Sequence, residues 1–354
     1  MSQRFAIFCF TDQGEQLARR IAGLLTVEAA KTDSPEAKDI IANSLSKQSD
    51  TASIHRVTKL SETVQPLFQT GRALVFIGAS GIAVRAIAPL IRSKTTDPAV
   101  IVIDEAGRFV IPLLSGHLGR ANRLASQIAA LIDATPVITT ATDVNGVFAF
   151  DAWASEYGYQ VANPSTIKIV ASAMLNGQTV GLSSDFAVSG DLPGLVEALD
   201  HGDLGVCISL DQTKHPFTET LKLVPTCVHI GIGSRKGVDV QLLKAFFFDT
   251  LANLAIPIQA VAAIASIDLK KNEPAINQLA ESLAVPFITY SAAELNTVAS
   301  LFEQSERVLA VTQTGNVCAA AAYLSSGQGR MVCPKTARDG CTIAIAISDW
   351  TVQF

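Results

Sequence analysis

The chain has 354 residues, 49% hydrophobic and 17% charged, so it can fill several packed domains and is not intrinsically disordered. Its net charge of −5 argues against general nucleic-acid binding. The longest apolar run, residues 254–267, is interrupted by Pro257 and Gln259, and the N-terminus lacks a cleavable signal pattern. We therefore expect a cytoplasmic protein without a membrane segment.

The first part of the chain alternates short apolar strands with amphipathic helices. We expect strands at 4–10, 73–77, 99–103, 109–113 and 135–139. Helices are expected at 13–25 and 61–70, after Gly81 as far as Ile91, and from Gly116 to Ile132. Residues 27–53 are polar and predict a variable surface segment or partial disorder.

The alternation continues to the C-terminus. In the middle part we expect helices at 150–157, 165–176 and 193–200, and strands at 179–183, 205–210 and 220–224. After Pro225 we expect strands at 227–232, 258–264, 286–290, 307–312, 331–333 and 342–347, with helices ending near 253 and at 273–284, 291–302 and 316–325. This pattern predicts an α/β protein of three α/β parts, with mostly parallel sheets covered by helices. The predicted domains are 1–143, a smaller middle domain 144–225, and 226–354.

Six cysteines are scattered without C-x-x-C pairing, which indicates buried thiols and neither a disulfide framework nor a metal site. Charge is uneven: residues 71–123 hold seven basic and three acidic side chains, a balance of +4, whereas the rest of the chain carries −9. Where such basic groups converge in space, they suit a small polyanionic ligand.

Reactive side chains concentrate in residues 101–123, which predict a strand, an acidic turn, a second strand and a Ser-Gly-His entry into a helix. In this arrangement Ser115 caps the helix and His117 lies in its first turn. The positive helix end disfavours protonated imidazole there and suits a general base. Asp104 or Glu105, in the acidic turn, orients His117 or activates water. The alternatives are a structural histidine and a solvated turn.

Two glycine-rich turns follow predicted strands. Gly78-Ala79-Ser80-Gly81 opens a helix and suits an anion, with an ordinary turn capped by Ser80 as the alternative. Residues 231–237 have the spacing Gly-x-Gly-x-x-x-Gly, and no acidic residue ends the next strand. They therefore predict a phosphate- or carboxylate-holding turn rather than a dinucleotide loop.

One set of motifs is shared with a known family. It comprises Val-Phe-Ile-Gly-Ala-Ser-Gly-Ile-Ala-Val-Arg at 75–85, Asp-Pro-Ala-Val at 97–100, Asp-Glu-Ala-Gly-Arg at 104–108, Ser-Gly-His at 115–117, Thr-Thr-Ala-Thr-Asp-Val-Asn-Gly at 139–146, Gly-Ile-Gly at 231–233 and Ala-Ser-Ile-Asp-Leu-Lys at 265–270. Together these motifs resemble the cobalt-precorrin-5A hydrolase family of anaerobic cobalamin synthesis. The chain departs from the family pattern at Ser234, where Cys is common, at Ala319, where an acid is usual, and at Arg120, where Gly is frequent.

The resemblance implies hydrolysis of the ring-A lactone of cobalt-precorrin-5A, with release of acetaldehyde to give cobalt-precorrin-5B. The substrate is then a cobalt-tetrapyrrole polycarboxylate that carries its own metal, so we expect no resident cofactor and no protein metal site. For this reaction we expect His117 as base, with Glu105 or Asp104 as its orienter. Backbone N–H groups near Gly116 and Gly119 are the expected oxyanion donors. The other expected substrate contacts are Gly78, Ser80, Gly81, Arg85, Arg108, Ser115, Arg120, Gly231, Gly233 and Arg235.

Two other functions remain open at this point: a protein that binds or channels corrinoid intermediates without catalysis, and a dinucleotide-dependent enzyme. Neighbouring enzymes of the cobalamin pathway are candidate partners, whereas nucleic acid and membrane are not expected. The sequence leaves the oligomeric state undetermined.

Overall fold

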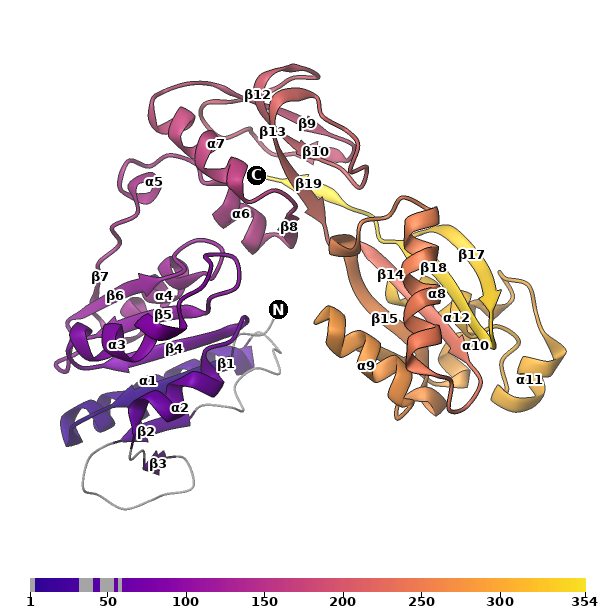
Figure 1. The fold of residues 1–354 in the computed structure, drawn as a ribbon, viewed down its shortest axis with the longest axis horizontal. Coiled ribbons are helices and arrows are strands. Elements are labelled where there is room, and N and C mark those ends of the chain that lie inside the picture. The colour runs from indigo at the N-terminus through magenta and orange to yellow at the C-terminus, as the bar shows by residue number, and fades with distance from the viewer. Residues whose placement is uncertain (1–3, 32–40, 45–53, 57–58) are drawn as a thin grey trace. The chain divides into compact units, whose positions relative to one another are not determined.

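The computed structural model describes residues 4–31, 41–44, 54–56 and 59–354, which form two compact units, residues 1–157 and 158–354 (Figure 1). We call them the N-terminal and the C-terminal unit. Most of the segment predicted to be a variable surface region, 27–53, lies outside the described residues. The division of the chain into three domains stays a prediction.

The N-terminal unit is built on a seven-stranded sheet of order β3-β2-β1-β4-β5-β6-β7. Strands β1 to β5 are parallel to one another. Strand β6 runs antiparallel to β5, and β7 runs parallel to β6. The bounds are β1 (Arg4–Cys9), β2 (Ile41–Ser44), β3 (Ile54–Arg56), β4 (Arg72–Ile77), β5 (Ala99–Ile103), β6 (Phe109–Leu114) and β7 (Thr135–Pro136).

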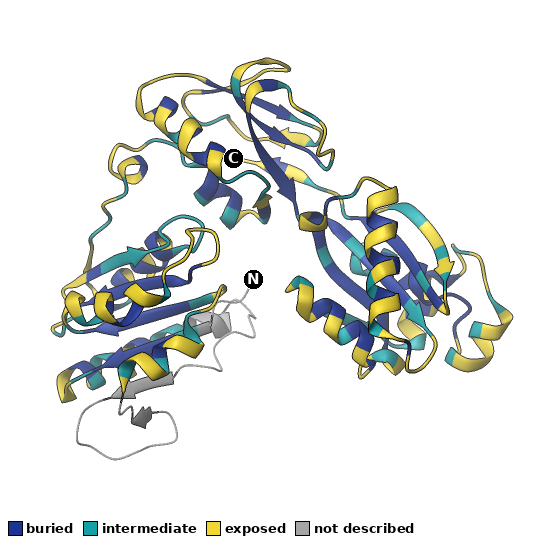
Figure 2. Ribbon diagram, viewed as in Figure 1, coloured by how far each residue is buried: buried dark blue, intermediate teal, exposed yellow. Residues whose placement is uncertain are grey.

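Helices cover both faces of this sheet, as expected for a mostly parallel sheet. On one face α1 (Asp12–Lys31) and α4 (Ala121–Ile132) pack against alternate residues of the central strands, and on the other face α2 (Leu60–Leu67) and α3 (Ser80–Ile87) do so. Figure 2 shows the central strands buried and the outer helix faces exposed. After α3 a short 3-10 turn, η2 (Ala88–Leu90), contains Pro89 and ends the helical segment. The unit closes with α5 (Ala141–Val144) and α6 (Phe150–Glu156).

The C-terminal unit begins with a five-stranded sheet of order β11-β9-β12-β13-β8, parallel except for β8. The bounds are β8 (Tyr159–Val161), α7 (Ser165–Leu175), β9 (Val180–Ser184), β11 (Val196–Ala198), β12 (Gly202–Ile208) and β13 (Phe217–Pro225). The predicted helix at 193–200 is wrong. Leu195 has a φ of 65°, and residues 196–198 pair with β9 as the edge strand of the sheet, so strand pairing overrides local helix propensity.

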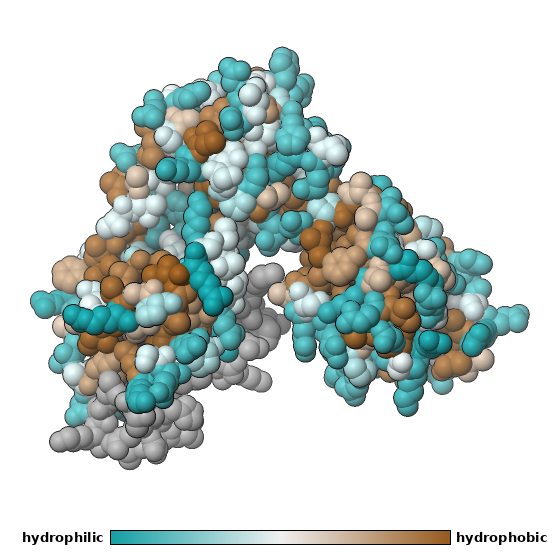
Figure 3. Space-filling view, in the orientation of Figure 1, coloured by the Kyte–Doolittle hydropathy of each residue, from teal (hydrophilic) through white to brown (hydrophobic). Residues whose placement is uncertain are grey.

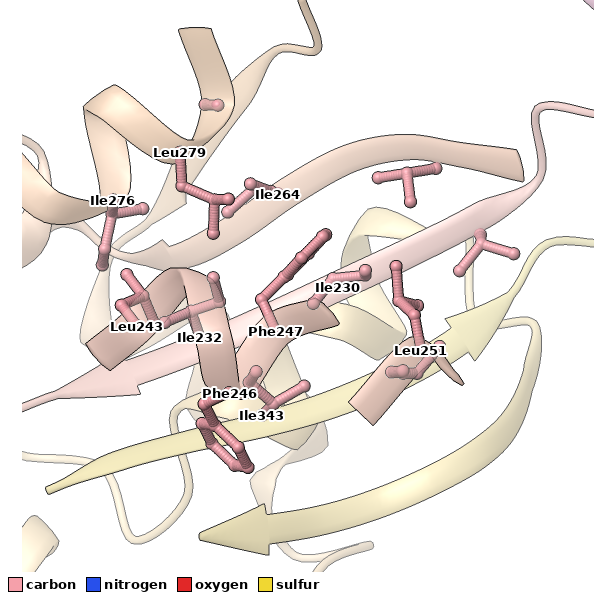
Figure 4. Packing of buried hydrophobic residues seen from close by; sticks show 14 of the residues in the cluster. Ile230, Ile232, Leu243, Phe246, Phe247, Leu251, Ile264, Ile276, Leu279 and Ile343 are labelled. Carbon is pink, nitrogen blue, oxygen red and sulfur yellow. The ribbon is translucent and has the colours of Figure 1, made fainter. Parts of the chain in front are cut away.

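A second five-stranded sheet, β16-β15-β14-β18-β17, follows in the same unit. Its elements are β14 (Val228–Ser234), α8 (Val240–Asn253), η3 (Ile258–Ala260), β15 (Val261–Ile267), η4 (Asp268–Lys270), α9 (Pro274–Leu283), β16 (Phe287–Tyr290), α10 (Ala292–Ala299), α11 (Glu306–Thr312), α12 (Cys318–Ser325), β17 (Arg330–Arg338) and β18 (Cys341–Ile347). Figure 4 shows its main core, in which Phe247 and Leu251 of α8 and Leu279 of α9 pack on Ile230 and Ile264.

Residues 307–312, predicted as a strand, form the helix α11 instead. The Ser305 hydroxyl accepts a hydrogen bond from the Val308 N–H at 3.4 Å, which caps the helix, and no residue of α11 is buried. The run of β-branched residues therefore misled the prediction because the segment lies on the surface and pairs with no strand.

The last strand, β19 (Thr351–Gln353), pairs in parallel with β10 (Ala187–Ser189) in a separate two-stranded sheet, so the end of the chain returns to a segment that lies between β9 and β11 in the sequence. All six cysteines are free; five are buried, as predicted, and Cys333 is half-buried. The predicted fold class, α/β with mostly parallel sheets, is confirmed.

Candidate functional site

Because β6 is antiparallel to β5, the residues predicted to form one site lie in two separate places. Val110 lies opposite Ile103 and Leu114 opposite Val100, so the end of β6 lies beside the start of β5. The acidic turn and the Ser-Gly-His loop are therefore at opposite edges of the sheet, about 20 Å apart for a six-residue strand. The structure does not bring Asp104 or Glu105 to His117.

His117 is held between two other carboxylates. Its Nδ1 donates to Asp151 at 3.1 Å, and its Nε2 donates to Asp143 Oδ2 at 2.9 Å. The Asn122 amide also donates to Asp143 Oδ2, at 3.1 Å, and to Thr140 Oγ1, at 2.8 Å. The His117 side chain is only 13% exposed, and that of Asp143 is 40% exposed. We call His117, Asn122, Asp143 and Asp151 the His117 cluster.

The loop before α4 explains why His117 points into this cluster. Helix α4 begins at Ala121 and not at Gly116, so the predicted helix start is wrong and His117 precedes the helix. Ser115 and Arg120 both have left-handed φ values, 58° and 65°, which fold residues 115–120 into a compact turn. A Cβ on Gly119 would lie 2.4 Å from that of Ser115, so this turn requires glycine there.

The environment of His117 favours the charged imidazolium. Its pKa is raised to about 9, chiefly by the hydrogen bond to Asp151 and then by Asp143, against the opposing effect of burial. For Asp151, burial acts to raise the pKa, but the hydrogen bond and charge of His117 outweigh it and the pKa is lowered. A pKa of about 9 favours the protonated imidazolium at neutral pH, which argues against a neutral general base. The expected position of His117 within the first turn of the helix is wrong, since the helix begins at Ala121.

The opposite edge collects the segments that follow the parallel strands β1, β4 and β5. There the Thr11 hydroxyl donates to Glu105, and the Gly78 N–H donates to the Ile103 carbonyl at 2.8 Å. We call Thr11, Gly78, Ser80 and Glu105 the glycine edge. The segments after the neighbouring strands β1 and β4 lead to helices on opposite faces, α1 and α3, and such a switch point is the usual ligand position in α/β sheets.

The acidic turn is largely structural. Asp104 Oδ1 accepts the backbone N–H groups of Arg108 and Phe109, at 2.7 and 2.6 Å. Glu105, bonded to Thr11, ties this turn to the loop after β1. The expected role of both acids as orienters of His117 is wrong, because Asp151 and Asp143 hold that imidazole.

The predicted basic anchors differ in availability. Arg85 and Arg108 are exposed; Arg85 reaches the Gly81 carbonyl at 3.4 Å, and Arg108 lies 3.8 Å from Asp104. Arg120 instead binds the hydroxyl and the carbonyl of Ser155, so it fastens α6 to the loop before α4. The Ser115 hydroxyl similarly donates to the Asp97 carbonyl at 3.0 Å.

The C-terminal glycines lie within a strand and not in a ligand loop. Gly231 and Gly233 belong to β14, and a Cβ on Gly231 would meet the Cys318 carbonyl of α12 at 1.8 Å. Gly231 thus allows a helix to pack closely on the sheet, and a Cβ on Gly233 would instead meet Thr342 of β18 at 2.5 Å. Their position within β14 corrects the prediction that these two glycines belong to a phosphate- or carboxylate-holding turn. Arg235 is exposed just after β14. The hydroxyl of Ser234 is buried without a hydrogen-bond partner among the described residues.

Sequence reasoning missed Asp151, Asn122 and the role of Asp143. Asp143 ends the Thr-Thr-Ala-Thr-Asp motif that was noted for its resemblance, so a pairing of that motif with Ser-Gly-His could have been proposed. Asp151 lies 34 residues from His117 and no local pattern marks it. Among the described residues, no group of three or more His, Cys, Asp or Glu side chains could hold a metal ion. No described helix is long and apolar enough to cross a membrane.

Fold and site define a multi-part α/β protein with an imidazolium between two carboxylates. Three family models match it in order: Cobalamin synthesis G N-terminal over residues 62–143, Cobalamin biosynthesis central region over 148–225, and Cobalamin synthesis G C-terminus over 228–346. The cobalt-precorrin-5A hydrolase of Salmonella typhimurium is 35% identical over 98% of both chains. The cobalt-precorrin-5A hydrolase of Priestia megaterium is 30% identical over 79% of this chain and 80% of its own.

The chain therefore belongs to the cobalt-precorrin-5A hydrolase family. A solved structure of a cobalamin biosynthesis protein G homolog from Sulfolobus solfataricus is 22% identical over 97% of both chains, with a TM-score of 0.41.

Proposed function

We propose that this protein is a cobalt-precorrin-5A hydrolase that opens the ring-A lactone of its substrate, after which the opened product loses acetaldehyde to give cobalt-precorrin-5B. The similarity to the Salmonella typhimurium hydrolase along 98% of both chains carries this proposal. The cobalt enters with the substrate, so the protein supplies only acid–base groups and binding contacts. The proposal includes a cytoplasmic location.

The His117 cluster offers the acid–base groups that lactone hydrolysis needs. A protonated His117 can donate a proton but cannot accept one, so it is the acid of the pair. Asp143 accepts both of its described hydrogen bonds on Oδ2 and remains 40% exposed, so water can reach this carboxylate. We therefore assign Asp143 as the base in place of His117.

The proton transfers balance within the cluster. Asp143 takes a proton from the water that attacks the lactone carbonyl carbon, and the acyl–oxygen bond then breaks. The leaving alkoxide takes the Nε2 proton of His117, and Asp143 returns its own proton to Nε2 across their 2.9 Å contact. Asp151, buried on the Nδ1 side, keeps the imidazole oriented throughout.

The activity is tested by incubating the purified chain with cobalt-precorrin-5A and measuring acetaldehyde through alcohol dehydrogenase and NADH oxidation. Wild-type protein should release acetaldehyde in proportion to substrate. Tight substrate binding without acetaldehyde would instead favour the alternative, a protein that carries or channels corrinoid intermediates.

The roles in the cluster are tested by Asp143→Asn, which keeps the shape of the side chain and removes its basicity. We expect kcat to fall by about 10²- to 10⁴-fold with little change in KM. His201→Gln, at an exposed histidine of the C-terminal unit, is the matched control. A normal kcat in Asp143→Asn would remove this residue from the chemistry while leaving the activity itself untouched.

A further inference from the structure

The sheet of the N-terminal unit has one face that its helices cover only in part. The buried members of the core on this face come from α2, α3 and strands β1, β4 and β5, whereas Ile111 and Leu113 of β6 are only partly buried at its margin. Helix α4 packs on the opposite face, against Val110. Beyond α3 the apolar side of β6 is thus only half-buried.

Exposed apolar side chains continue this margin on both sides. Phe109 begins β6, points to the same side as Ile111, and is 45% exposed. The β4–α3–β5 crossover is right-handed, so the flank of α3 that carries the exposed Val84 is turned towards β5 and β6. Ile91, just after η2, is also exposed. We call Val84, Ile91, Phe109, Ile111 and Leu113 the β6 surface.

Positive charges lie at both ends of the β6 surface. Arg108, 76% exposed, precedes Phe109 at the end that adjoins the end of β5. Arg92 and Lys94 lie in the exposed loop before β5, at the other end, about 15 Å away along a five-residue strand. Figure 3 shows apolar side chains gathered where Figure 1 places α3 and β6, crossed and bordered by hydrophilic ones.

Few acids oppose these charges. Asp97 is buried, and its carboxylate accepts the backbone N–H groups of Arg92 and Ser93, at 3.0 and 3.1 Å. No described carboxylate lies within ion-pair distance of the Arg92 or Lys94 side chain. Only Asp104, 3.8 Å from Arg108, offsets part of the charge. The surface therefore combines an apolar strip with cationic ends.

We propose that the β6 surface binds the tetrapyrrole substrate, with the flat apolar macrocycle against the strip and peripheral carboxylates paired with Arg92, Lys94 and Arg108. This inference rests on the proposed function, which supplies a ligand that is apolar on its faces and anionic at its rim. Charge complementarity selects this occupant, since a neutral apolar partner would gain nothing from the cationic ends.

The binding is measured without turnover, by calorimetric titration of the full chain with cobyrinic acid, a corrin with free carboxylates. Cobinamide, in which amides replace these carboxylates, is the matched ligand control. We expect cobyrinic acid to bind more tightly than cobinamide. Its affinity should fall when salt is added, because salt screens the charges. Equal binding of the two ligands would overturn the charge argument.

Two sets of variants place the ligand on the surface. Because exposed ion contacts are individually weak, we expect Arg92→Gln combined with Lys94→Gln to weaken the binding of cobyrinic acid by about tenfold, which corresponds to about 1.4 kcal/mol. Phe109→Ser should weaken the binding of both ligands, and Arg307→Gln on α11 should change the affinity for neither. Unchanged affinity in both variants would overturn the proposal. A wild-type dimer that Phe109→Ser dissociates would assign the surface to a second copy of the chain instead.

The acetaldehyde assay keeps this inference separate from the proposed function. Wild-type protein that binds cobyrinic acid at the β6 surface but releases no acetaldehyde would refute the hydrolase and retain the surface. Turnover that is normal in both variants, with unchanged KM, would retain the hydrolase and refute the surface.

Discussion

The two edges of the N-terminal sheet bind polar groups in different ways. At the His117 cluster a buried imidazolium is bonded to two carboxylates and no described basic group besides His117 compensates them. At the glycine edge the polar groups are half-exposed, and Glu105 has an uncharged partner, Thr11. The ion pairs of the His117 cluster thus stabilise the unit and can also transfer protons. The glycine edge instead has the half-exposed polar groups and the small residues that are typical of a ligand-binding site.

The comparison shows how a single antiparallel strand can separate neighbouring motifs. The acidic turn and the Ser-Gly-His loop are joined by β6 alone. They nevertheless lie at opposite ends of the strands, because β6 runs alongside the whole length of β5. A cluster of reactive residues in sequence therefore does not define one site unless the strand between them is also accounted for.

The largest expected effect is that of His117→Ala on stability. Removal of the imidazolium leaves the Asp151 carboxylate buried and uncompensated, which costs about 3–5 kcal/mol. Urea unfolding followed by Trp153 fluorescence, in a Trp350→Phe background, reports the N-terminal unit specifically, because these are the two tryptophans of the chain. His201→Ala is the control, and equal midpoints in both variants would contradict the assigned role.

The stability of the same unit should depend on pH through His117. Its pKa rises from 6.5 to about 9 on folding, so its contribution is complete below about pH 6.5 and is lost as the pH rises through 9. The lost stability is about 3 kcal/mol at most. The pKa of Asp151 is lowered on folding, so its contribution to stability is present at higher pH. This contribution is lost when Asp151 becomes protonated, as the pH falls below the usual carboxyl range. Urea midpoints from pH 2 to 10 test both, and a flat profile above pH 7 would refute the first.

Gly78→Ala should disturb the glycine edge by an intermediate amount. Gly78 has a φ of 146°, and a Cβ there would lie 3.0 Å from the Phe10 ring. Strain of this kind costs about 1–3 kcal/mol. Gly23→Ala, in α1 with open space around it, is the matched control and should be neutral or stabilising. A neutral Gly78→Ala would show that this turn adapts freely.

The smallest expected effect is that of Glu105→Gln. The amide can still accept the Thr11 hydroxyl, so we expect a change below about 1 kcal/mol in stability and a kcat near that of the wild type. A large loss of kcat with normal stability would move the chemistry to the glycine edge and reverse the comparison between the two edges.

Local patterns predicted most of the elements because buried strands and amphipathic helices have clear periods. They also singled out His117, but as a neutral base, whereas its surroundings favour the charged imidazolium. Two flanking glycines suggested a helix start at Gly116, whereas left-handed Ser115 and Arg120 delay the helix to Ala121. The protonation state depends on Asp151, which comes from a helix in a later segment, and no spacing rule connects these two residues.

The pairing of β19 with β10 has a consequence for the order of events during synthesis. Trp350 donates its indole N–H to the Tyr159 hydroxyl at 3.0 Å, a contact between residues 191 positions apart, and β19 follows it directly. Strand β10, which among the described strands pairs with β19 alone, must therefore wait unpaired while the whole second sheet is translated. The N-terminal unit has no such dependence and can complete its sheet while the ribosome is still making the remainder of the chain.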